Sequence, residues 1–206
     1  MNSIFEINFI SIICMLFSYL LGSIPIGYII FRIKKKDDIR NYGSGNIGAT
    51  NVNRLIGKKF AAFTLFFDLF KSLICCYLSN EMLGNEIAKL CGFLCILGHI
   101  YPIWLKFRGG KGVASFIGYL SFISWPLALI FIFIWFVTVK LFKISAIGAV
   151  TSLIFNIMLF KFLLFIQFNY SSFLWIPGEP LDFYFILITT IIILFRHKNN
   201  LKSILK

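Results

Sequence analysis

Residues 112–139 read GVASFIGYLSFISWPLALIFIFIWFVTV, and this stretch decides how often the chain crosses a membrane. It is long enough for one transmembrane helix, but Trp125-Pro126 lies near its middle, and proline interrupts helices. A single crossing would also place the basic residues at its two ends on opposite faces of the membrane, against the positive-inside rule. We therefore predict two arms, 112–124 and 126–139, that form a hairpin bent at Pro126.

Both arms of this hairpin are short for a membrane crossing. At about 1.5 Å per residue, each spans about 20 Å, whereas the hydrocarbon core is about 30 Å thick. We expect the flanking segments 106–112 and 140–145 to dip to membrane level. Irregular backbone is tolerated there when it is buried in protein or lines a wet cavity.

The composition of the whole chain supports a membrane protein. Of its 206 residues, 59% are hydrophobic and only 14% are charged, whereas ordinary globular domains are about 45–50% apolar. This excludes a soluble enzyme, a disordered tail and a disulfide-stapled secreted module. The five cysteines all lie in apolar runs, so we interpret them as small buried hydrophobic residues. The N-terminus lacks the basic region and cleavage site of a signal peptide, so we expect the first apolar segment to be retained.

Apolar runs divide the chain into spans. We predict an all-α polytopic membrane protein of about seven transmembrane helices, with residues 1–206 forming one domain. The runs are 7–31, 60–79, 87–105, 112–124, 126–139, 145–168 and 182–195.

The basic residues predict sidedness. The segments that hold 17 of the 20 lysines and arginines are 32–59, 106–111, 140–143 and 196–206. The segments that hold none are 1–6, 80–86 and 169–181. The first set is therefore expected inside, which gives an outside N-terminus and a cytoplasmic C-terminus. The formal net charge of +12 lies in short segments between apolar runs, so it favours anionic lipid head groups or phosphorylated substrates over nucleic acid.

Apart from Asp182, which begins the last span, four charged residues lie within the spans. Lys89 and Lys161 are near the outer ends, where a lysine can snorkel to the interface. Asp68 and Lys71 lie mid-span, three residues apart on one helix face. We expect them to form a structural ion pair or to line a wall of the active site.

The first inner segment contains RNYGSGNIGATNVNR at residues 40–54. Its glycines match a dinucleotide fingerprint, but that fingerprint needs a preceding strand, and here an apolar span precedes it. Glycines also allow positive φ and close approach, while Arg40 and Arg54 flank the stretch. Such a segment suits an anion held by backbone N–H groups and arginine. The alternative is a solvated glycine-rich turn.

The second inner segment, residues 104–115, reads WLKFRGGKGVAS. It lacks the first glycine of a P-loop, but glycines on both sides of Lys111 would let the backbone wrap a phosphate. A helix that begins directly after Gly112 would add an N-terminus, which attracts anions. The alternative, a basic interfacial anchor, does not require three glycines.

The third element is FRHKNN at residues 195–200. His197 could carry a proton or contact a phosphate, or it could be an ordinary interfacial polar residue. We interpret His99, near the inner end of the third span, as structural. The only carboxylates in the loops with these glycines are Asp37 and Asp38, which disfavours a carboxylate-held metal ion. We expect no metal and no cofactor.

Together these motifs closely resemble the PlsY family of bacterial membrane acyl-phosphate:glycerol-3-phosphate acyltransferases. The resemblance runs from about residue 18 to the C-terminus. The segments that carry it are Gly22-Ser23-Ile24-Pro25, GSGNIGATN at 43–51 with Arg54, GGKGVA at 109–114 and RHKNN at 196–200.

The resemblance implies that a fatty acyl group moves from acyl phosphate to the sn-1 hydroxyl of glycerol 3-phosphate, giving lysophosphatidic acid and phosphate. The residues that match the family's catalytic positions are Ser44, Arg54, Lys111, His197 and Asn200. The residues expected to bind substrate or phosphate are Gly43, Gly45, Asn46, Asn51, Gly109, Gly110, Gly112, Ser115 and Ser145. The family mechanism implies no metal, no coenzyme A and no acyl-enzyme.

The chain departs from the family pattern at two points. Ser115 stands where the family usually has threonine, and no glutamate follows His197. Membrane lipid and a soluble enzyme that makes acyl phosphate are the further expected partners. The expected location is the bacterial cytoplasmic (inner) membrane, with the active site facing the cytoplasm.

Two other functions fit parts of the pattern. A membrane transporter of an organic phosphate would also use short glycine-interrupted spans and cationic loops. Alternating access requires polar site residues reachable from both faces, whereas the predicted anion ligands lie on the inner side only. A structural membrane subunit would not need the glycine-lysine loop.

Overall fold

The computed structural model describes residues 8–170 and 177–204, and every regular element within them is helical. The all-α prediction is therefore confirmed. Residues 1–6 and 171–176, which belong to two of the predicted outer segments, lie outside the described residues. The α-helices are α1 (Phe9–Ser23), α2 (Ile26–Lys35), α3 (Ala49–Ile56), α4 (Lys58–Leu83), α5 (Asn85–Ile100), α6 (Val113–Ile123), α7 (Trp125–Phe142), α8 (Ser145–Asn169) and α9 (Pro180–Ile204). The short 3₁₀ helices are η1 (Ile39–Asn41) and η2 (Ile103–Leu105).

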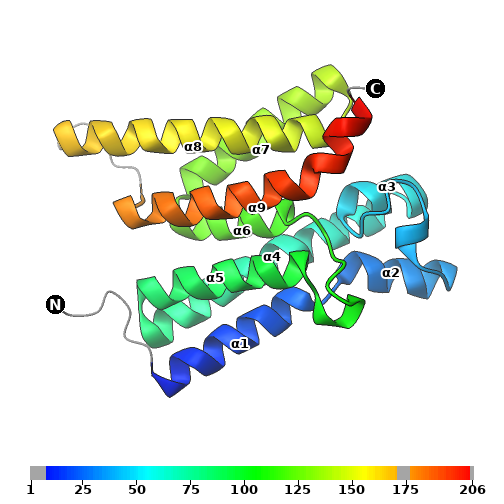
Figure 1. Ribbon diagram of the computed structural model, residues 1–206, viewed down its shortest axis with the longest axis horizontal. Helices are drawn as coiled ribbons and strands as arrows, with labels where there is room; N and C mark the ends of the chain where they lie inside the picture. Colours follow the sequence, from blue (N-terminus) through cyan, green and yellow to red (C-terminus); the bar gives the residue numbers. More distant parts are fainter. Residues whose placement is uncertain (1–7, 171–176, 205–206) are drawn as a thin grey trace. The chain divides into compact units, whose positions relative to one another are not determined.

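The chain divides into two compact units, Met1–Tyr119 (unit 1) and Leu120–Lys206 (unit 2), and α6 runs across the boundary. In unit 1, α1, α4 and α5 run side by side, and α2 and α3 lie together at one end of that group (Figure 1). Helices α1 and α5 lie so close together that a Cβ atom added at Gly98 would overlap the carbonyl oxygen of Tyr19. Small residues bring transmembrane helices together in this way.

The first predicted span, 7–31, is wrong as a single helix. α1 ends at Ser23 and α2 begins at Ile26, with Pro25 between them. Proline has no N–H and its ring crowds the preceding turn, so it breaks the ladder of backbone hydrogen bonds even inside an apolar run. Together α1 and α2 are still long and apolar enough to cross a membrane.

A small apolar core lies where the inner segments of unit 1 meet. It joins one residue of α2, one of η1, one of η2 and two from the first glycine-rich segment, and partly buried side chains of α3 and α4 pack against it. Its members are Phe31, Ile39, Ile47, Val52 and Leu105. This core fixes segments that are far apart in the sequence.

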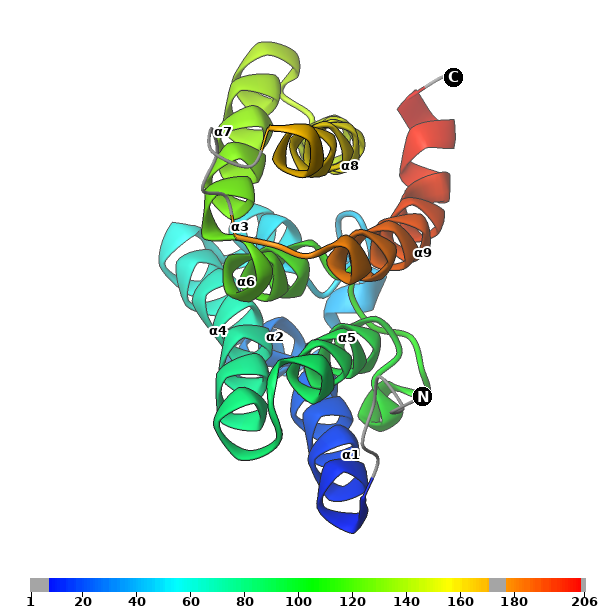
Figure 2. The same cartoon turned by 90° about the vertical axis from the view of Figure 1, so that its left-hand side faces the viewer.

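In unit 2, α8 packs against α7 on one side and α9 on the other, and Figure 2 looks nearly along α8. The predicted break near Pro126 is confirmed, because α6 ends at Ile123 and α7 begins at Trp125 with its proline in the first turn. Six helical segments within the described residues are long and apolar enough to cross a membrane, and α6 is a shorter apolar helix. The count of about seven is therefore confirmed.

Several helices are longer than the apolar runs predicted. α7 has 18 residues and continues to Phe142, about 27 Å at 1.5 Å per residue, so residues 140–142 of the predicted dipping segment 140–145 belong to a helix. The last helix is also longer than the predicted run 182–195, because α9 continues to Ile204. Only Gly84, with φ 82°, separates α4 from α5. Basic residues that the charge pattern assigned to inner segments lie in the last turns of α7 and α9.

The prediction that the cysteines are buried is confirmed for four of the five, whereas the prediction that Lys89 snorkels is wrong. All five cysteines are free, and four of them are buried. Lys89 is only 1% exposed and its ammonium lies 3.0 Å from a carboxylate oxygen of Glu86, so it forms an ion pair instead of snorkelling. Lys161 is exposed, as a snorkelling lysine would be.

Candidate active site

The first glycine-rich segment forms a tight turn before α3. Gly43 and Gly45 have φ of 60° and 67°, which glycine adopts without strain. Ser44 stands between them and is exposed. The turn therefore presents the Ser44 hydroxyl and nearby backbone to the surroundings.

Asn51, in the first turn of α3, holds this turn in shape. Its side-chain oxygen accepts a hydrogen bond from the backbone N–H of Ser44 at 3.0 Å, and its amide donates to the carbonyls of Tyr42 at 3.1 Å and Asn46 at 2.9 Å. Asn51 is 1% exposed. Arg54, one turn further, lies 3.4 Å from the same Asn51 oxygen and is exposed. Asn51 thus shapes the turn and links it to Arg54.

The second glycine segment continues from η2 to the start of α6. The N–H of Gly109 donates to the carbonyl of Ile100 at 3.2 Å, and the N–H of Gly110 donates to the carbonyl of His99 at 3.0 Å. The segment is thereby pinned back onto the end of α5. Lys111 follows, half-buried, and α6 begins two residues later. The predicted helix start behind the glycine-lysine segment is confirmed.

His99 explains why Gly110 has no side chain. A Cβ atom at Gly110 would overlap the Nε2 atom of the His99 ring, and one at Gly109 would overlap Pro102 and the His99 carbonyl. Both glycines are needed for close packing on the end of α5, in addition to any use of their backbone by a ligand. Ser115, in the first turn of α6, is buried and donates its hydroxyl to the backbone carbonyl of Asp68 at 2.9 Å. That hydroxyl therefore joins α6 to α4.

The two glycine segments are tied to each other through Arg40. Its guanidinium donates to the carbonyl of Leu105 in η2 at 3.3 Å and pairs with the carboxylate of Asp38 at 2.6 Å. Hydrogen bonding from Arg40 lowers the pKa of Asp38 below its usual value. Leu105 also belongs to the apolar core described above, so both glycine segments are anchored on that core, which is their shared foundation.

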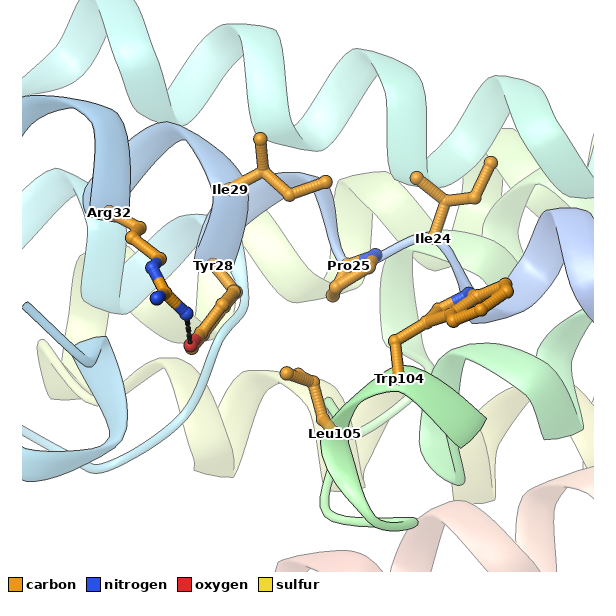
Figure 3. Close-up of a pocket in the computed structure, with 7 residues that line it drawn as sticks. All are labelled: Ile24, Pro25, Tyr28, Ile29, Arg32, Trp104 and Leu105. Atoms are coloured by element: carbon orange, nitrogen blue, oxygen red, sulfur yellow. Dashed lines mark hydrogen bonds between the residues drawn. The ribbon is translucent and has the colours of Figure 1, made fainter.

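Beside this foundation lies a hollow of about 350 Å³, lined by Ile24, Pro25, Tyr28, Ile29, Arg32, Trp104 and Leu105 (Figure 3). The Arg32 guanidinium donates to the Tyr28 hydroxyl at 2.9 Å at one end, and apolar side chains form the rest of the lining (Figure 3). The indole of Trp104 is 62% exposed. The hollow therefore combines one cation with an apolar wall.

Asp68 and Lys71 form the ion pair that their spacing predicts. Both are buried, and the ammonium lies 2.9 Å from the carboxylate. The same ammonium lies 3.0 Å from Nδ1 of His99. Residue spacing does not indicate that His99 joins this pair, because His99 comes from another helix.

Unit 2 holds the remaining candidates. His197, 2% exposed in α9, has its Nδ1 atom 2.8 Å from the carbonyl of Ile193. A carbonyl only accepts, so Nδ1 carries a proton and Nε2 is the nitrogen whose protonation can change. Asn200 lies three residues on, on the same face of α9. Ser145 is the first residue of α8 and is half-buried.

The structure thus sorts the predicted residues into two groups. Those in unit 1 lie in the two glycine segments and the first turn of α6: Gly43, Ser44, Gly45, Asn46, Asn51, Arg54, Gly109, Gly110, Lys111, Gly112 and Ser115. Those in unit 2 are Ser145, His197 and Asn200. Within residues 8–170 and 177–204, no three His, Cys, Asp or Glu side chains gather as they would around a metal ion.

Known proteins are similar to this chain in sequence and in fold. A sequence model of the glycerol-3-phosphate acyltransferase family matches residues 12–206. A glycerol-3-phosphate acyltransferase of Brucella anthropi is 38% identical over 192 residues, which cover 93% of this chain and 88% of the relative. The enzyme of the same name from Rhodopseudomonas palustris (strain BisB5) is 37% identical over 195 residues, covering 95% of this chain and 92% of the relative.

Two solved structures are also similar. One is PlsY (YgiH), described as an integral membrane glycerol 3-phosphate acyltransferase in its glycerol 3-phosphate form. It has a TM-score of 0.82 and 29% identity, and the match covers 95% of this chain and 92% of that one. The other is the lysophosphatidic acid form of PlsY, with a TM-score of 0.80, 29% identity, and coverage of 95% of this chain and 91% of that one.

Proposed function

We propose a reaction for this chain, which belongs to the glycerol-3-phosphate acyltransferase family: it transfers a fatty acyl group from acyl phosphate to the sn-1 hydroxyl of glycerol 3-phosphate. The hydroxyl oxygen attacks the acyl carbon, the bond from that carbon to the phosphate oxygen breaks, and the hydroxyl proton leaves with the phosphate. The products are lysophosphatidic acid and phosphate. Acylation of glycerol 3-phosphate is the activity named for the relatives, whereas the acyl phosphate donor is our own assignment.

One observation carries the proposal: unit 1 holds two glycine segments, each with a cation, on one shared foundation. The first segment offers Ser44 and Arg54, the second offers Lys111, and Arg40 ties the first to Leu105 beneath the second. Phosphate monoesters carry about −1.5 to −2 charges near neutrality. Fixed cations can neutralise such charge and align the attacking hydroxyl without reorganising during the reaction.

The donor chemistry suits a site of this kind. An acyl phosphate is a mixed anhydride with a good leaving group, so positioning and charge neutralisation are enough and no covalent intermediate is needed. The hollow beside α2 is apolar apart from Arg32 and Tyr28, which suits an acyl chain near an anionic head.

We assign His197 and Asn200 to the same reaction, with units 1 and 2 forming one functional domain. The Nδ1 atom of His197 is held by the Ile193 carbonyl, so its Nε2 atom has a fixed direction in which to contact a phosphate oxygen. We further propose that the site opens to the cytoplasm from the cytoplasmic membrane, because glycerol 3-phosphate is soluble and the basic segments are expected inside. Acyl phosphate would be supplied by a soluble enzyme.

The test is an acylation assay with two donors. Purified protein is given glycerol 3-phosphate with either palmitoyl phosphate or palmitoyl coenzyme A, without added metal, and lysophosphatidic acid is measured by mass spectrometry. We expect product with palmitoyl phosphate only. Good turnover with the coenzyme A ester and none with the phosphate would overturn the donor assignment. No product with either donor would overturn the proposed reaction.

A further inference from the structure

Three buried polar residues meet beneath the second glycine segment without belonging to either substrate loop. Asp68 and Lys71 come from α4, and His99 comes from the last turn of α5. The ammonium of Lys71 lies 2.9 Å from Oδ1 of Asp68 and 3.0 Å from Nδ1 of His99, and that Nδ1 lies 3.3 Å from the same carboxylate oxygen. Unpaired charges are expensive in a membrane interior, so this cluster is held together strongly.

The cluster also anchors the break between α1 and α2. Lys71 donates to the carbonyls of Gly22 at 2.9 Å and Ile24 at 3.4 Å, which lie three residues and one residue before Pro25. The proline leaves carbonyls at the end of α1 without partners in their own helix, and the lysine satisfies them. Lys71 therefore joins α1, α4 and α5 at one point.

From that point the His99 ring reaches the second glycine segment. Its Nδ1 edge contacts the ion pair, and its Nε2 edge lies so close to Gly110 that a Cβ there would overlap it. The carbonyl of His99 also accepts from the N–H of Gly110 at 3.0 Å. Ser115, five residues after Gly110, adds a second link, because its hydroxyl donates to the backbone carbonyl of Asp68. The segment that carries Lys111 is thus supported from the cluster at both ends.

We propose that Asp68, Lys71 and His99 are positioning residues, which hold the Gly109–Gly110 backbone in the form that presents Lys111 to the phosphate of glycerol 3-phosphate. This inference rests on the proposed function. The ion pair fixes the ring, the ring fixes the backbone at Gly110, and that backbone sets where Lys111 is presented. None of the three residues needs to touch substrate.

The chain contains a matched control for this cluster. Glu86 and Lys89 form another ion pair of i, i+3 spacing, with nitrogen and oxygen 3.0 Å apart and the lysine buried, in the first turns of α5. His99 lies in the last turn of the same helix. A purely structural role predicts that damage at either end of α5 has the same kind of effect. A positioning role predicts that only the His99 end changes the affinity for glycerol 3-phosphate.

The primary variant is His99→Asn, because asparagine keeps a polar atom near the Nδ1 position and removes the Nε2 edge that supports Gly110. We expect the KM for glycerol 3-phosphate to rise about tenfold with kcat changed less than about twofold. The double variant Glu86→Gln/Lys89→Met should lower the unfolding temperature and leave that KM within about twofold of the wild type. Direct binding of glycerol 3-phosphate by calorimetry is measured for each protein alongside turnover.

A size swap gives the sharper test. Gly110→Ala alone should raise the KM for glycerol 3-phosphate, because the new methyl group collides with the His99 ring. In His99→Asn/Gly110→Ala the methyl group enters space that the ring has left, so the double variant should have a lower KM than Gly110→Ala. Contacting residues couple in this way, whereas independent sites give additive effects.

The outcomes separate the inference from the proposed function. A KM and a calorimetric affinity that are unchanged in His99→Asn, or additive effects in the double variant, would overturn the positioning role even if the wild type is fully active. If the wild type binds glycerol 3-phosphate but forms no product, the reaction is wrong, and weaker binding by His99→Asn would still support the positioning role. A wild type that does not bind glycerol 3-phosphate would overturn both.

Discussion

Units 1 and 2 hold their candidate residues in different ways. In unit 1, the two glycine segments are irregular backbone, and buried side chains such as Asn51 and His99 hold that backbone in place. In unit 2, His197 and Asn200 project from the long helix α9, whose own hydrogen bonds fix the backbone. Irregular backbone at membrane depth must be satisfied by protein groups, whereas a helix satisfies itself. Variants in unit 1 should therefore damage binding through distant supports, and variants in unit 2 should act only through the side chain removed.

The largest effect is expected at Lys111. In Lys111→Ala, the loss of a charge-assisted contact in a water-poor site should lower kcat/KM about 10²-fold or more. Lys106→Asn is the matched control, because Lys106 is an exposed cation of the same segment with φ 53°, a conformation that asparagine tolerates. Steady-state kinetics of both variants check this, and wild-type rates in Lys111→Ala would remove that residue from the site.

A smaller loss is expected at His197. Asparagine in His197→Asn can still donate to the Ile193 carbonyl but lacks the Nε2 atom, so turnover should fall about 30-fold, the equivalent of one hydrogen bond to a charged group. The unfolding temperature should change little, since α9 keeps its backbone bonds. A large drop in that temperature with little loss of kcat would mean that His197 is structural. It would contradict the proposed difference between the two units.

Asn51 tests the same difference between the two units, this time through a buried support in unit 1. Asn51→Ala removes three hydrogen bonds that shape the Gly43–Asn46 turn, so the KM for glycerol 3-phosphate should rise about tenfold and the unfolding temperature should fall. Asn53→Ala, an exposed position two residues along α3, is the matched control and should affect neither quantity. Equal kinetics for the two variants would show that the turn does not depend on its buried clamp.

The smallest effect concerns pH and the Asp38–Arg40 pair. Arg40 lowers the pKa of Asp38 in the folded protein, so the pair stabilises the fold above the ordinary aspartate pKa of about 3.9. This contribution is lost as the pH falls through the lowered pKa. A partly exposed pair contributes about 1 kcal/mol or less. The difference in unfolding temperature between wild type and Asp38→Asn should therefore be present at neutral pH and shrink in strong acid, and a constant difference would contradict the assignment.

The sequence alone predicts the features that depend on local chemistry. Hydrophobic runs give the spans, and Pro126 marks a break because basic residues on both sides also require one. Pro25 is the same residue type in an equally apolar run, yet its break is missed because no charge pattern draws attention to it. The end of α9 is missed for the opposite reason: Arg196 and Lys198 look like a loop but are well tolerated in a helix that continues to Ile204.

The site shows the same limit. Glycine, lysine and arginine in the inner segments identify where an anion would bind, because those residue types act locally. The contacts that support these segments cannot be predicted in the same way, since His99 reaches Gly110 and Lys71 reaches Gly22 only after three helices have packed together. Long-range contacts of this kind leave no spacing pattern in a single sequence.

The proposed reaction requires that the residues assigned to it in both units act on one anionic substrate from one side of the membrane. Ser44→Cys in unit 1 and Ser145→Cys in unit 2 are nearly isosteric replacements, and the native cysteines, which lie within apolar helices, provide the background. An impermeant thiol reagent is applied to inside-out and right-side-out vesicles, with and without glycerol 3-phosphate. We predict that both new cysteines react from the cytoplasmic face only and that glycerol 3-phosphate slows both reactions. Reaction from different compartments, or protection of one cysteine and not the other, would contradict the account.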